Sequence, residues 1–320
     1  MAGRDARIAL VGATGTVGSQ IVELIGERNF PYSELKLFAR DSAGQLVDTG
    51  ERSLPVAVFN GAEDLSTFDV AFIALPSEAA AAIIEAQPGP TLIDLSAANV
   101  SPRDRVAIVA PGLTAHERVM EFGKGYAFGV PHPAAQVIAT ILRVLRSEGP
   151  SAASIMLSAS AAGHIGVSEL FQQSADLLNA RLELEDQPQV SFNIYAPKAA
   201  GELAAAFAAQ IGVLGADSSR LLLDIVRVPA FHGTGVMLFM PADATREGWP
   251  ERLRSAPGLI VVADQAVTGL VDALGQDGAL TRLSLQNGGA AIWCAFDAAR
   301  LAALTAIWIA EIITAAAVAE

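Results

Sequence analysis

The chain is poor in cysteine and in basic residues. Its single cysteine among 320 residues, Cys294, excludes a disulfide framework and a cysteine-based metal site, and is typical of a reducing compartment. Lysine and arginine together number 21 against 34 acidic residues, which gives a net charge of −13. The basic residues are scattered, and this argues against nucleic acid and anionic membrane as partners. We therefore expect a cytoplasmic protein with no metal site.

The two ends of the chain raise the question of membrane targeting. The N-terminal residues MAGRDARIALVGATG lead directly into an apolar strand pattern, so we expect no signal peptide. Residues 301–320 are almost uncharged and about as long as a membrane span. Alanine is only weakly hydrophobic, Glu311 lies within the segment and no basic flank follows it. A buried C-terminal helix is therefore favoured over a membrane span.

Strand and helix patterns alternate in the first half of the chain. The runs RIALVG, LKLFAR, DVAFIALP and TLIDLS indicate buried strands, and VGSQIVELIGER indicates an amphipathic helix. This order predicts an α/β, Rossmann-type domain with a parallel sheet covered by helices. From Ser154 onward, longer strand patterns predict an α+β domain whose mostly antiparallel sheet suits a dimer interface. We expect a dinucleotide-binding domain at 1–130 and 299–320, and a substrate and dimerisation domain at 131–298.

The strongest motif is ALVGATGTVGSQIVELI. A buried strand ends at Gly12 and a helix starts near Val17, so backbone N–H groups and the helix N-terminus converge on one spot that suits a pyrophosphate. Gly12 permits the tight turn, Gly15 permits the approach of a ligand, and Gly18 permits close packing of helix on strand. The motif predicts dinucleotide binding.

The residues after the second predicted strand bear on the choice of dinucleotide. Arg40 favours the 2′-phosphate of NADP, whereas Asp41 directly after it keeps NAD open. A solvated surface arginine is the alternative interpretation of Arg40. The predicted cofactor-binding residues are Gly12, Thr14, Gly15, Thr16, Val17, Gly18, Arg40 and Ser42.

Six segments together resemble aspartate-semialdehyde dehydrogenases, a family of amino acid biosynthesis, and occur in the order expected of that family. They are VGATGTVGSQIVELI, SAG from Ser42, LIDLSAA from Leu92, SFNIYAP from Ser191, VRVPAFHG from Val226 and AALTAIWIAE from Ala302. The resemblance implies an NADP-binding N-terminal domain and a second domain that supplies most catalytic groups and the dimer interface. It also implies a reaction in which a cysteine attacks the aldehyde, hydride transfer gives a thioester, and phosphate cleaves the thioester.

The reacting residues implied by the resemblance are replaced in this chain. The nucleophilic cysteine corresponds to Pro133, or to Ala134 if the alignment shifts by one residue. The acid/base histidine corresponds to Thr234, although the substrate-binding arginine seven residues before it is present as Arg227. Covalent catalysis needs an activated nucleophile with a base in reach. Removing one member of such a unit costs on the order of 10⁶ in kcat in a well-studied hydrolase.

Other positions of the resemblance differ as well. A glutamine that orients the reaction corresponds to Leu157, a phosphate-contacting arginine to Val100 and a lysine to Ala205. Leu301 stands where the family has a glycine beside the nicotinamide, and the larger side chain reduces the room for that ring. The phosphate-binding turn therefore predicts dinucleotide binding, while the C-terminal helix argues against productive placement of the nicotinamide.

A few side chains are candidates for a replacement chemistry. His132, beside the vacated cysteine position, is the candidate general acid or base. The resemblance places His164 and His232 in the same cleft, with Ser158 and Ser160 nearby. For each of these residues a satisfied surface or structural role is the alternative interpretation. Cys294 falls in the buried strand pattern AAIWCAF, so we expect it to be unreactive.

Three interpretations of function remain. The favoured one is a catalytically silent, USG-1-like member of the family that keeps the fold, the homodimer face and the NADP turn, and acts by binding. The rival is a working NAD(P)-dependent oxidoreductase that uses His132 and Arg227 on a carboxylate-bearing aldehyde or ketone. The third is a structural dimer partner without a ligand, against which the retained glycine turn argues. Arg227 suits bidentate recognition of a carboxylate, so a small acidic ligand is expected under the first two.

Overall fold

In the computed structural model the chain divides into two compact units. Unit 1 comprises residues 1–136 and 299–320, and unit 2 comprises residues 137–298. The structure describes residues 6–50, 52–96, 100–122, 127–146, 149–181, 188–241, 246–286 and 288–319. Ala97 and Ala98, which end the LIDLSAA segment of the resemblance, lie outside the described residues.

Unit 1 is built on a sheet of eight strands in the order β3-β4-β2-β1-β5-β6-β8-β7. Neighbouring strands pair in parallel, except that β3 and β4 are antiparallel. The strands are β1 (Ala6–Val11), β2 (Tyr32–Ala39), β3 (Leu46–Asp48), β4 (Ser53–Val58), β5 (Val70–Ile73), β6 (Thr91–Asp94), β7 (Val106–Ile108) and β8 (Ala127–Gly129). Strand β5 is apolar and buried at all four of its residues, which is typical of a parallel sheet covered on both faces.

The helices of unit 1 include α1, which begins directly after the glycine-rich turn. It is amphipathic and buries Ile21, Val22, Leu24 and Ile25 in the core of the unit. The helices are α1 (Thr16–Glu27), the 3₁₀ turn η1 (Ala62–Leu65), α2 (Ser77–Ala86), α3 (His116–Glu121), the first turn of α4 (Pro133–Leu145) and all but the first residue of α8 (Ala298–Ala319). The predicted parallel α/β fold is confirmed for this unit.

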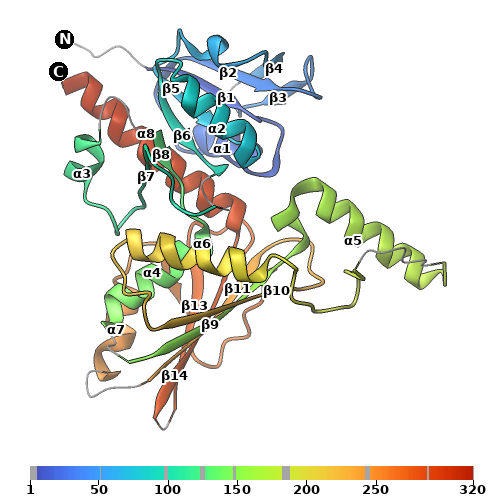
Figure 1. Ribbon diagram of the computed structural model, residues 1–320, viewed down its shortest axis with the longest axis vertical. Helices are drawn as coiled ribbons and strands as arrows, with labels where there is room; N and C mark the ends of the chain where they lie inside the picture. Colours follow the sequence, from blue (N-terminus) through green and yellow to red (C-terminus); the bar gives the residue numbers. More distant parts are fainter. Residues whose placement is uncertain are drawn as a thin grey trace. The chain divides into compact units, whose positions relative to one another are not determined.

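The C-terminal helix α8 is part of the core of unit 1. Ala303, Ala306, Ile307 and Ala310 are buried in the same cluster as strands β1 and β5 (Figure 1). Within the described residues, α8 contains one stretch, Ala298–Ala315, that is long and apolar enough to cross a membrane, and 50% of that stretch is buried. The prediction of a buried C-terminal helix is confirmed, because the core accounts for its apolar face.

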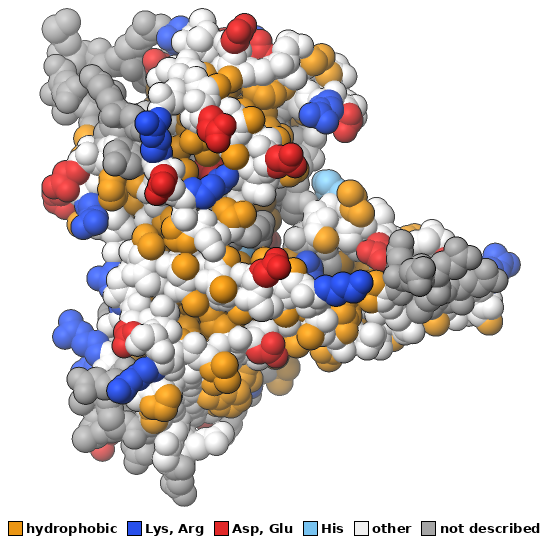
Figure 2. Space-filling view, viewed as in Figure 1, with side chains coloured by type: hydrophobic (Ala, Val, Ile, Leu, Met, Phe, Trp, Pro, Cys, Tyr) orange, Lys and Arg blue, Asp and Glu red, His pale blue; other side chains and the backbone are white. Residues whose placement is uncertain are grey.

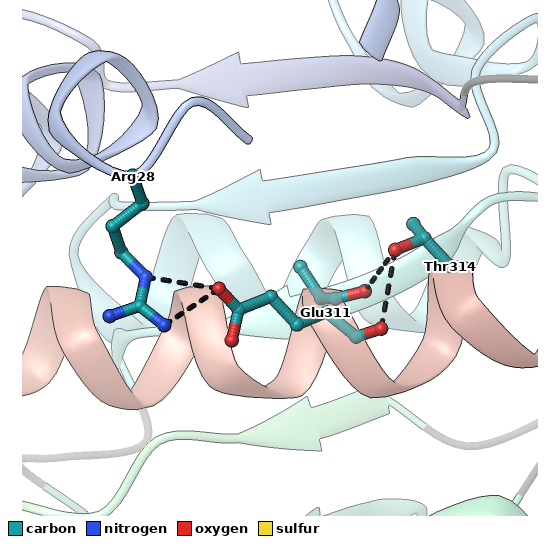
Figure 3. Close-up of polar contacts among 4 residues, drawn as sticks. Arg28, Glu311 and Thr314 are labelled. Atoms are coloured by element: carbon teal, nitrogen blue, oxygen red, sulfur yellow. Dashed lines mark hydrogen bonds and ion pairs between the residues drawn. The ribbon is translucent and has the colours of Figure 1, made fainter. Parts of the chain in front are cut away.

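Two ion pairs fasten α8 to the end of α1. Arg28 donates from Nε and Nη2 to Glu311 Oε1 at 3.0 and 2.8 Å (Figure 3). Arg300, at the start of α8, donates from Nη2 to Glu27 Oε2 at 2.6 Å. Neighbouring residues at the end of α1 thus hold both ends of the buried stretch of α8.

Unit 2 is built on a six-stranded sheet in the order β10-β9-β11-β14-β13-β12. The three inner pairings are antiparallel, and the pairings of β10 with β9 and of β12 with β13 are parallel. The strands are β9 (Ser151–Leu157), β10 (Leu221–Arg227), β11 (Thr234–Pro241), β12 (Leu259–Val261), β13 (Ala279–Gln286) and β14 (Gly289–Phe296). The predicted α+β unit with a mostly antiparallel sheet is confirmed.

The helices of unit 2 differ in how they use the sheet. Helix α6 packs along β10, whereas α5 extends away from the sheet (Figure 1). Apolar side chains lie on the surface of α5 (Figure 2), among them Ile165, Phe171 and Leu178. The helices are the remainder of α4, η3 (Ala159–Ala162), α5 (Gly163–Leu178), α6 (Ala200–Val213), η4 (Arg246–Gly248) and α7 (Trp249–Arg254).

Candidate functional site

The turn after β1 has a conformation that only glycine adopts without cost. Gly12 has φ +87°, and its N–H donates to the carbonyl oxygen of Phe38 at 2.8 Å. A Cβ built on Gly12 would lie 2.2 Å from the carbonyl oxygen of Ala74, on the turn after β5. The positive φ and the close approach of two main-chain segments both require glycine here. The switch point of the sheet lies at this strand, since β2 and β5 flank β1 on opposite sides.

The first turn of α1 leaves its backbone donors available to a ligand. Gly15 is the N-cap residue, and no side chain caps the helix, so the N–H groups of Thr16, Val17 and Gly18 lack the partner that a capping side chain provides. A Cβ on Gly18 would lie 2.1 Å from the carbonyl oxygen of Gly12, which explains why helix and turn pack so closely. An unsatisfied helix N-terminus of this kind favours an anionic group.

The end of β2 lies next to this turn, because β1 and β2 pair in parallel. Thr14 Oγ1 and Ser42 Oγ are 2.6 Å apart and share a hydrogen bond. Arg40 follows the last residue of β2 and is exposed. Over the described ranges its guanidinium forms no ion pair. The structure therefore brings Thr14, Ser42 and the glycine turn together, with Arg40 at the adjoining strand end.

A buried ion pair lies at the carboxyl end of β6. Asp94 is fully buried and accepts from Arg103 Nη2 at 2.5 Å and from the N–H of Ser96 at 2.8 Å. Arg103 also donates to Ser96 Oγ at 3.1 Å. The resemblance places a phosphate-contacting arginine at Val100. The nearest arginine in the sequence is Arg103, and its guanidinium is paired with Asp94. Sequence reasoning missed this pair, although an aspartate that ends a buried strand signals a need for a partner.

The positions that the resemblance assigns to the nucleophilic cysteine lie at the start of α4. Pro133 is the first residue of the helix and Ala134 is fully buried. His132 is buried as well, and its Nδ1 accepts from the N–H of Ala134 at 3.1 Å, while its carbonyl accepts from the N–H of Gln136 at 3.0 Å. His132 therefore caps α4. Because the amide hydrogen occupies the lone pair of Nδ1, the basic nitrogen of the neutral ring is engaged, which disfavours a general-base role.

In unit 2 the positions expected for the acid/base histidine and the orienting glutamine lie side by side. Thr234 on β11 is the register partner of Leu157 on β9, and both are buried. Ser158, also buried, shares a hydrogen bond with Ser160 at 3.0 Å between the two hydroxyl oxygens. His164 and His232 are exposed.

Arg227 lines a cleft of about 680 Å³ in unit 2. Its backbone pairs with that of Tyr195 through hydrogen bonds of 2.8 and 3.2 Å, and its Nη1 donates to the carbonyl oxygen of Ser158 at 3.1 Å. Partial burial lowers the pKa of Arg227 from its ordinary value, an effect that Tyr195 opposes. No carboxylate pairs with Arg227 in the part of the chain that the structure describes. His164 and His232 are not among the residues that line this cleft.

Cys294 lies in the centre of the sheet of unit 2. It is fully buried on β14, and burial raises the pKa of its thiol to about 12. Thr281 on the neighbouring strand β13 is its register partner, with 3.6 Å between the hydroxyl oxygen and Sγ. The predicted burial of Cys294 is confirmed, and its lack of reactivity stays a prediction.

Comparisons with known proteins identify the family. Residues 7–120 match the family described as semialdehyde dehydrogenase, NAD binding domain. A USG-1 protein homolog from Pseudomonas aeruginosa is 32% identical over 84% of this chain and 84% of its own length, and one from Azotobacter vinelandii is 31% identical over 96% and 97%. The chain belongs to the aspartate-semialdehyde dehydrogenase family.

Solved structures of the aspartate-semialdehyde dehydrogenase family share the fold over the whole chain. The structure of a probable aspartate-semialdehyde dehydrogenase from Pseudomonas aeruginosa has a TM-score of 0.84 at 28% identity, covering 97% of this chain and 98% of its own. Together with the NAD-binding domain match, this confirms the predicted family, the oxidoreductase fold and a nucleotide-binding domain. The glycine turn at Gly12, Gly15 and Gly18 lies within the matched residues.

The C-terminal helix of this aspartate-semialdehyde dehydrogenase homologue shows how Leu301 is accommodated. Leu301 is buried in α8. One turn further on, Thr305 is buried and donates from Oγ1 to Gln136 Oε1 at 3.0 Å, which links α8 to the first turn of α4. Leu301 is thus buried, and Thr305 is engaged in a hydrogen bond within unit 1.

Proposed function

We propose that this member of the aspartate-semialdehyde dehydrogenase family binds a dinucleotide and a small carboxylate without carrying out the thiol-dependent reaction that the resemblance implies. The observation that carries the proposal is the place of the only cysteine in the sequence. Cys294 is enclosed in a β-sheet and its thiol pKa is raised to about 12. The thiolate is the nucleophilic form of cysteine, so no thiolate is available at neutral pH to form a thioester.

The first turn of α4 supports the same conclusion. Neither Pro133 nor Ala134 has a side chain that can attack an aldehyde. His132 caps the helix through Nδ1, so its use as a base in place of Thr234 would require breaking that cap. A role by binding, as a sensor or regulatory protein, is consistent with a site that has kept ligand contacts and lost reacting groups.

We propose NADP as the cofactor. Arg40 is exposed at the end of β2 and lacks an ion-pair partner over the described ranges, which suits the 2′-phosphate. Thr14 and Ser42, joined by their hydrogen bond, and the donors of Thr16, Val17 and Gly18 would contact the remaining phosphates and ribose. Leu301 in α8 would limit productive placement of the nicotinamide ring.

We further propose that residues 1–130 and 299–320 form the dinucleotide-binding domain of a cytoplasmic homodimer, and that residues 131–298 supply the dimer face. The sheet of unit 2 supports this assignment. Leu222 on β10 and Phe239 on β11 are both register partners of Ala152, and they are 73% and 53% exposed. These two exposed apolar side chains lie on the strands that flank β9, and exposed apolar side chains that lie close together are typical of a protein–protein interface.

The second candidate is a working oxidoreductase that uses hydride transfer without a thiol. Arg227 favours it equally, because a carboxylate-bearing aldehyde or ketone would pair with the same guanidinium, which has no carboxylate partner among the described residues. The capping role of His132 is the observation against it. Oxidation of NADPH by such a substrate, with reduction of its carbonyl to an alcohol in the absence of phosphate, would establish this alternative.

The test of the proposed binding is a calorimetric titration of the full chain with NADPH and NADH. Gly15 has φ −74°, which alanine adopts, and a Cβ there would lie 3.3 Å from the carbonyl oxygen of Gly12. Gly15→Ala therefore needs only a small shift of the turn and adds a methyl group where the pyrophosphate would approach. We expect this change to weaken NADPH binding at least about tenfold, which corresponds to about 1.4 kcal/mol. Ser19→Ala, an exposed change one turn later on α1, is the matched control and should bind as the parent does.

The choice between the two cofactors is tested by Arg40→Ala. We expect this change to weaken NADPH binding and to leave NADH binding unchanged. Equal binding of NADPH by the parent protein, Gly15→Ala and Arg40→Ala would contradict the proposed site.

A further inference from the structure

The cleft around Arg227 has apolar walls, which a short polar substrate would not require. Its volume of about 680 Å³ falls within the range of about 300–1,000 Å³ that is typical of ligand pockets. Apolar side chains from three segments line it: Leu170 on α5, Val190 on the following loop and Val228 after β10. The charged groups in the lining are Arg227, Lys198 and Glu169.

The polar part of the cleft is built around one half-buried cation. Arg227 has lost part of its hydration, which is why its pKa is lowered, and it has no carboxylate partner in the described segments. The loop that carries Tyr195 is fixed to it by two backbone hydrogen bonds, and Lys198, three residues later, lines the same cleft. A carboxylate of the ligand would replace the lost hydration and meet two cations.

The remaining lining restricts the rest of the ligand. Glu169 would repel a second carboxylate, so a dicarboxylate fits poorly. Val190 and Val228 are half-buried, and Leu170, 3% exposed, lies behind the cleft surface. An apolar tail lying on Val190 and Val228 would displace water from apolar surface on both sides. We propose that this cleft binds a monocarboxylate with an apolar tail, such as an aryl-substituted acid, in place of a short-chain semialdehyde. The proposal rests on carboxylate recognition by Arg227, which is part of the proposed function.

The test is a calorimetric titration of the full chain with three probes. They are 3-phenylpropanoate, which has both the acid group and the tail; L-aspartate, which lacks an apolar tail; and 3-phenylpropan-1-ol, which lacks the charge. We expect 3-phenylpropanoate to bind at least about tenfold more tightly than either of the others, since burial of the ring and the charge-assisted contact both contribute.

Three substitutions assign the binding to this cleft. Val190→Ser leaves the backbone hydrogen bond from its N–H to Gln173 in place, and should weaken 3-phenylpropanoate about three- to tenfold without changing the affinity for L-aspartate. Val267→Ser is the matched control, because Val267 is 95% exposed and does not line the cleft. Lys198→Gln, at an exposed position, should weaken both acids. Arg227→Gln is the third substitution and removes the other positive charge of the cleft. Lys198→Gln serves as the charge variant if Arg227→Gln fails to fold.

The outcomes separate this inference from the proposed function. Equal affinities for L-aspartate and 3-phenylpropanoate would overturn the claim that the cleft recognises an apolar tail, and would leave carboxylate recognition intact. Equal affinities for the acid and the alcohol, or no effect of either charge variant, would overturn carboxylate recognition itself. The dinucleotide titration is made with other ligands and stands independently of both results.

Discussion

Alanine substitutions at Gly12 and Gly44 should differ in their cost, although both glycines have φ +87°. A Cβ at Gly44 meets nothing within 4 Å, whereas a Cβ at Gly12 would lie 2.2 Å from the carbonyl oxygen of Ala74. Neither partner at Gly12 can move freely. The N–H of Gly12 bonds to Phe38, and the N–H of Ala74 bonds to Val11 at 2.9 Å.

The expected magnitudes follow from these two surroundings. Alanine in the left-handed region costs about 1–2 kcal/mol, and this is the whole expected loss in the free energy of unfolding for Gly44→Ala. Gly12→Ala adds a steric overlap between main-chain segments, and forced repacking of this kind costs about 1–3 kcal/mol more.

The measurement is urea unfolding of both variants and the parent, followed by far-UV circular dichroism. We expect the midpoint for Gly12→Ala to lie clearly below that for Gly44→Ala. Coincident midpoints would refute the argument that β1 and the turn after β5 exclude a side chain at Gly12.

Three further predictions concern the ion pairs, Cys294 and the positions at which the resemblance places the nucleophile. Glu27→Gln removes the carboxylate that pairs with the buried guanidinium of Arg300 and should cost about 1–3 kcal/mol of unfolding free energy. Glu311→Gln breaks the more exposed pair with Arg28 and should cost below about 1 kcal/mol; urea unfolding that ranks the two variants in the reverse order contradicts this assignment. Cys294 should resist a thiol reagent such as DTNB in the folded protein and react at once in urea. Because burial raises its folded pKa from 9.0 to about 12, its contribution to stability should be complete below about pH 9 and be lost as the pH rises towards 12, which unfolding at several pH values would detect in comparison with Cys294→Ala. Pro133→Cys and Ala134→Cys should each remain without aspartate-semialdehyde turnover, since an imidazole at Thr234 and a glutamine at Leu157 are still missing; appreciable turnover from either single change is the result against it.

Long, strongly patterned elements of this fold could be predicted from the sequence. The strands β1, β2, β5 and β6 each contain a buried apolar stretch, and α1 has a regular apolar face. The three-residue strands β3, β7 and β8 were not predicted, because so few residues show no periodicity. Strand β4 contains Pro55 and pairs with the edge strand β3, so its pattern is interrupted. Strand β13 was missed because its polar residues Thr281, Arg282 and Ser284 break the apolar run.

The candidate site could be predicted only where a residue acts through its own backbone geometry or through the family resemblance. The glycines at 12, 15 and 18 are of this kind, because their spacing indicates where the backbone lies too close to another segment or to a ligand for a side chain. The capping role of His132 depends on how its side chain is placed at the start of α4, and the pairing of Asp94 with Arg103 joins residues nine positions apart without a periodic pattern. The lining of the Arg227 cleft includes residues that are far apart in the sequence, such as Leu170 and Val228, which are 58 positions apart. No local sequence pattern indicates that they line one cleft.

The most direct test of the central claim is a turnover assay with aspartate semialdehyde, NADP and phosphate. The protein should be purified from a host that lacks its own aspartate-semialdehyde dehydrogenase, and NADPH binding should be measured on the same sample. We predict binding of NADPH with no reduction of NADP above the rate of the buffer. Phosphate-dependent reduction of NADP that persists in Cys294→Ala would contradict the account. It would indicate an effective nucleophile in the segment from Pro131 to Gln136, at the start of α4.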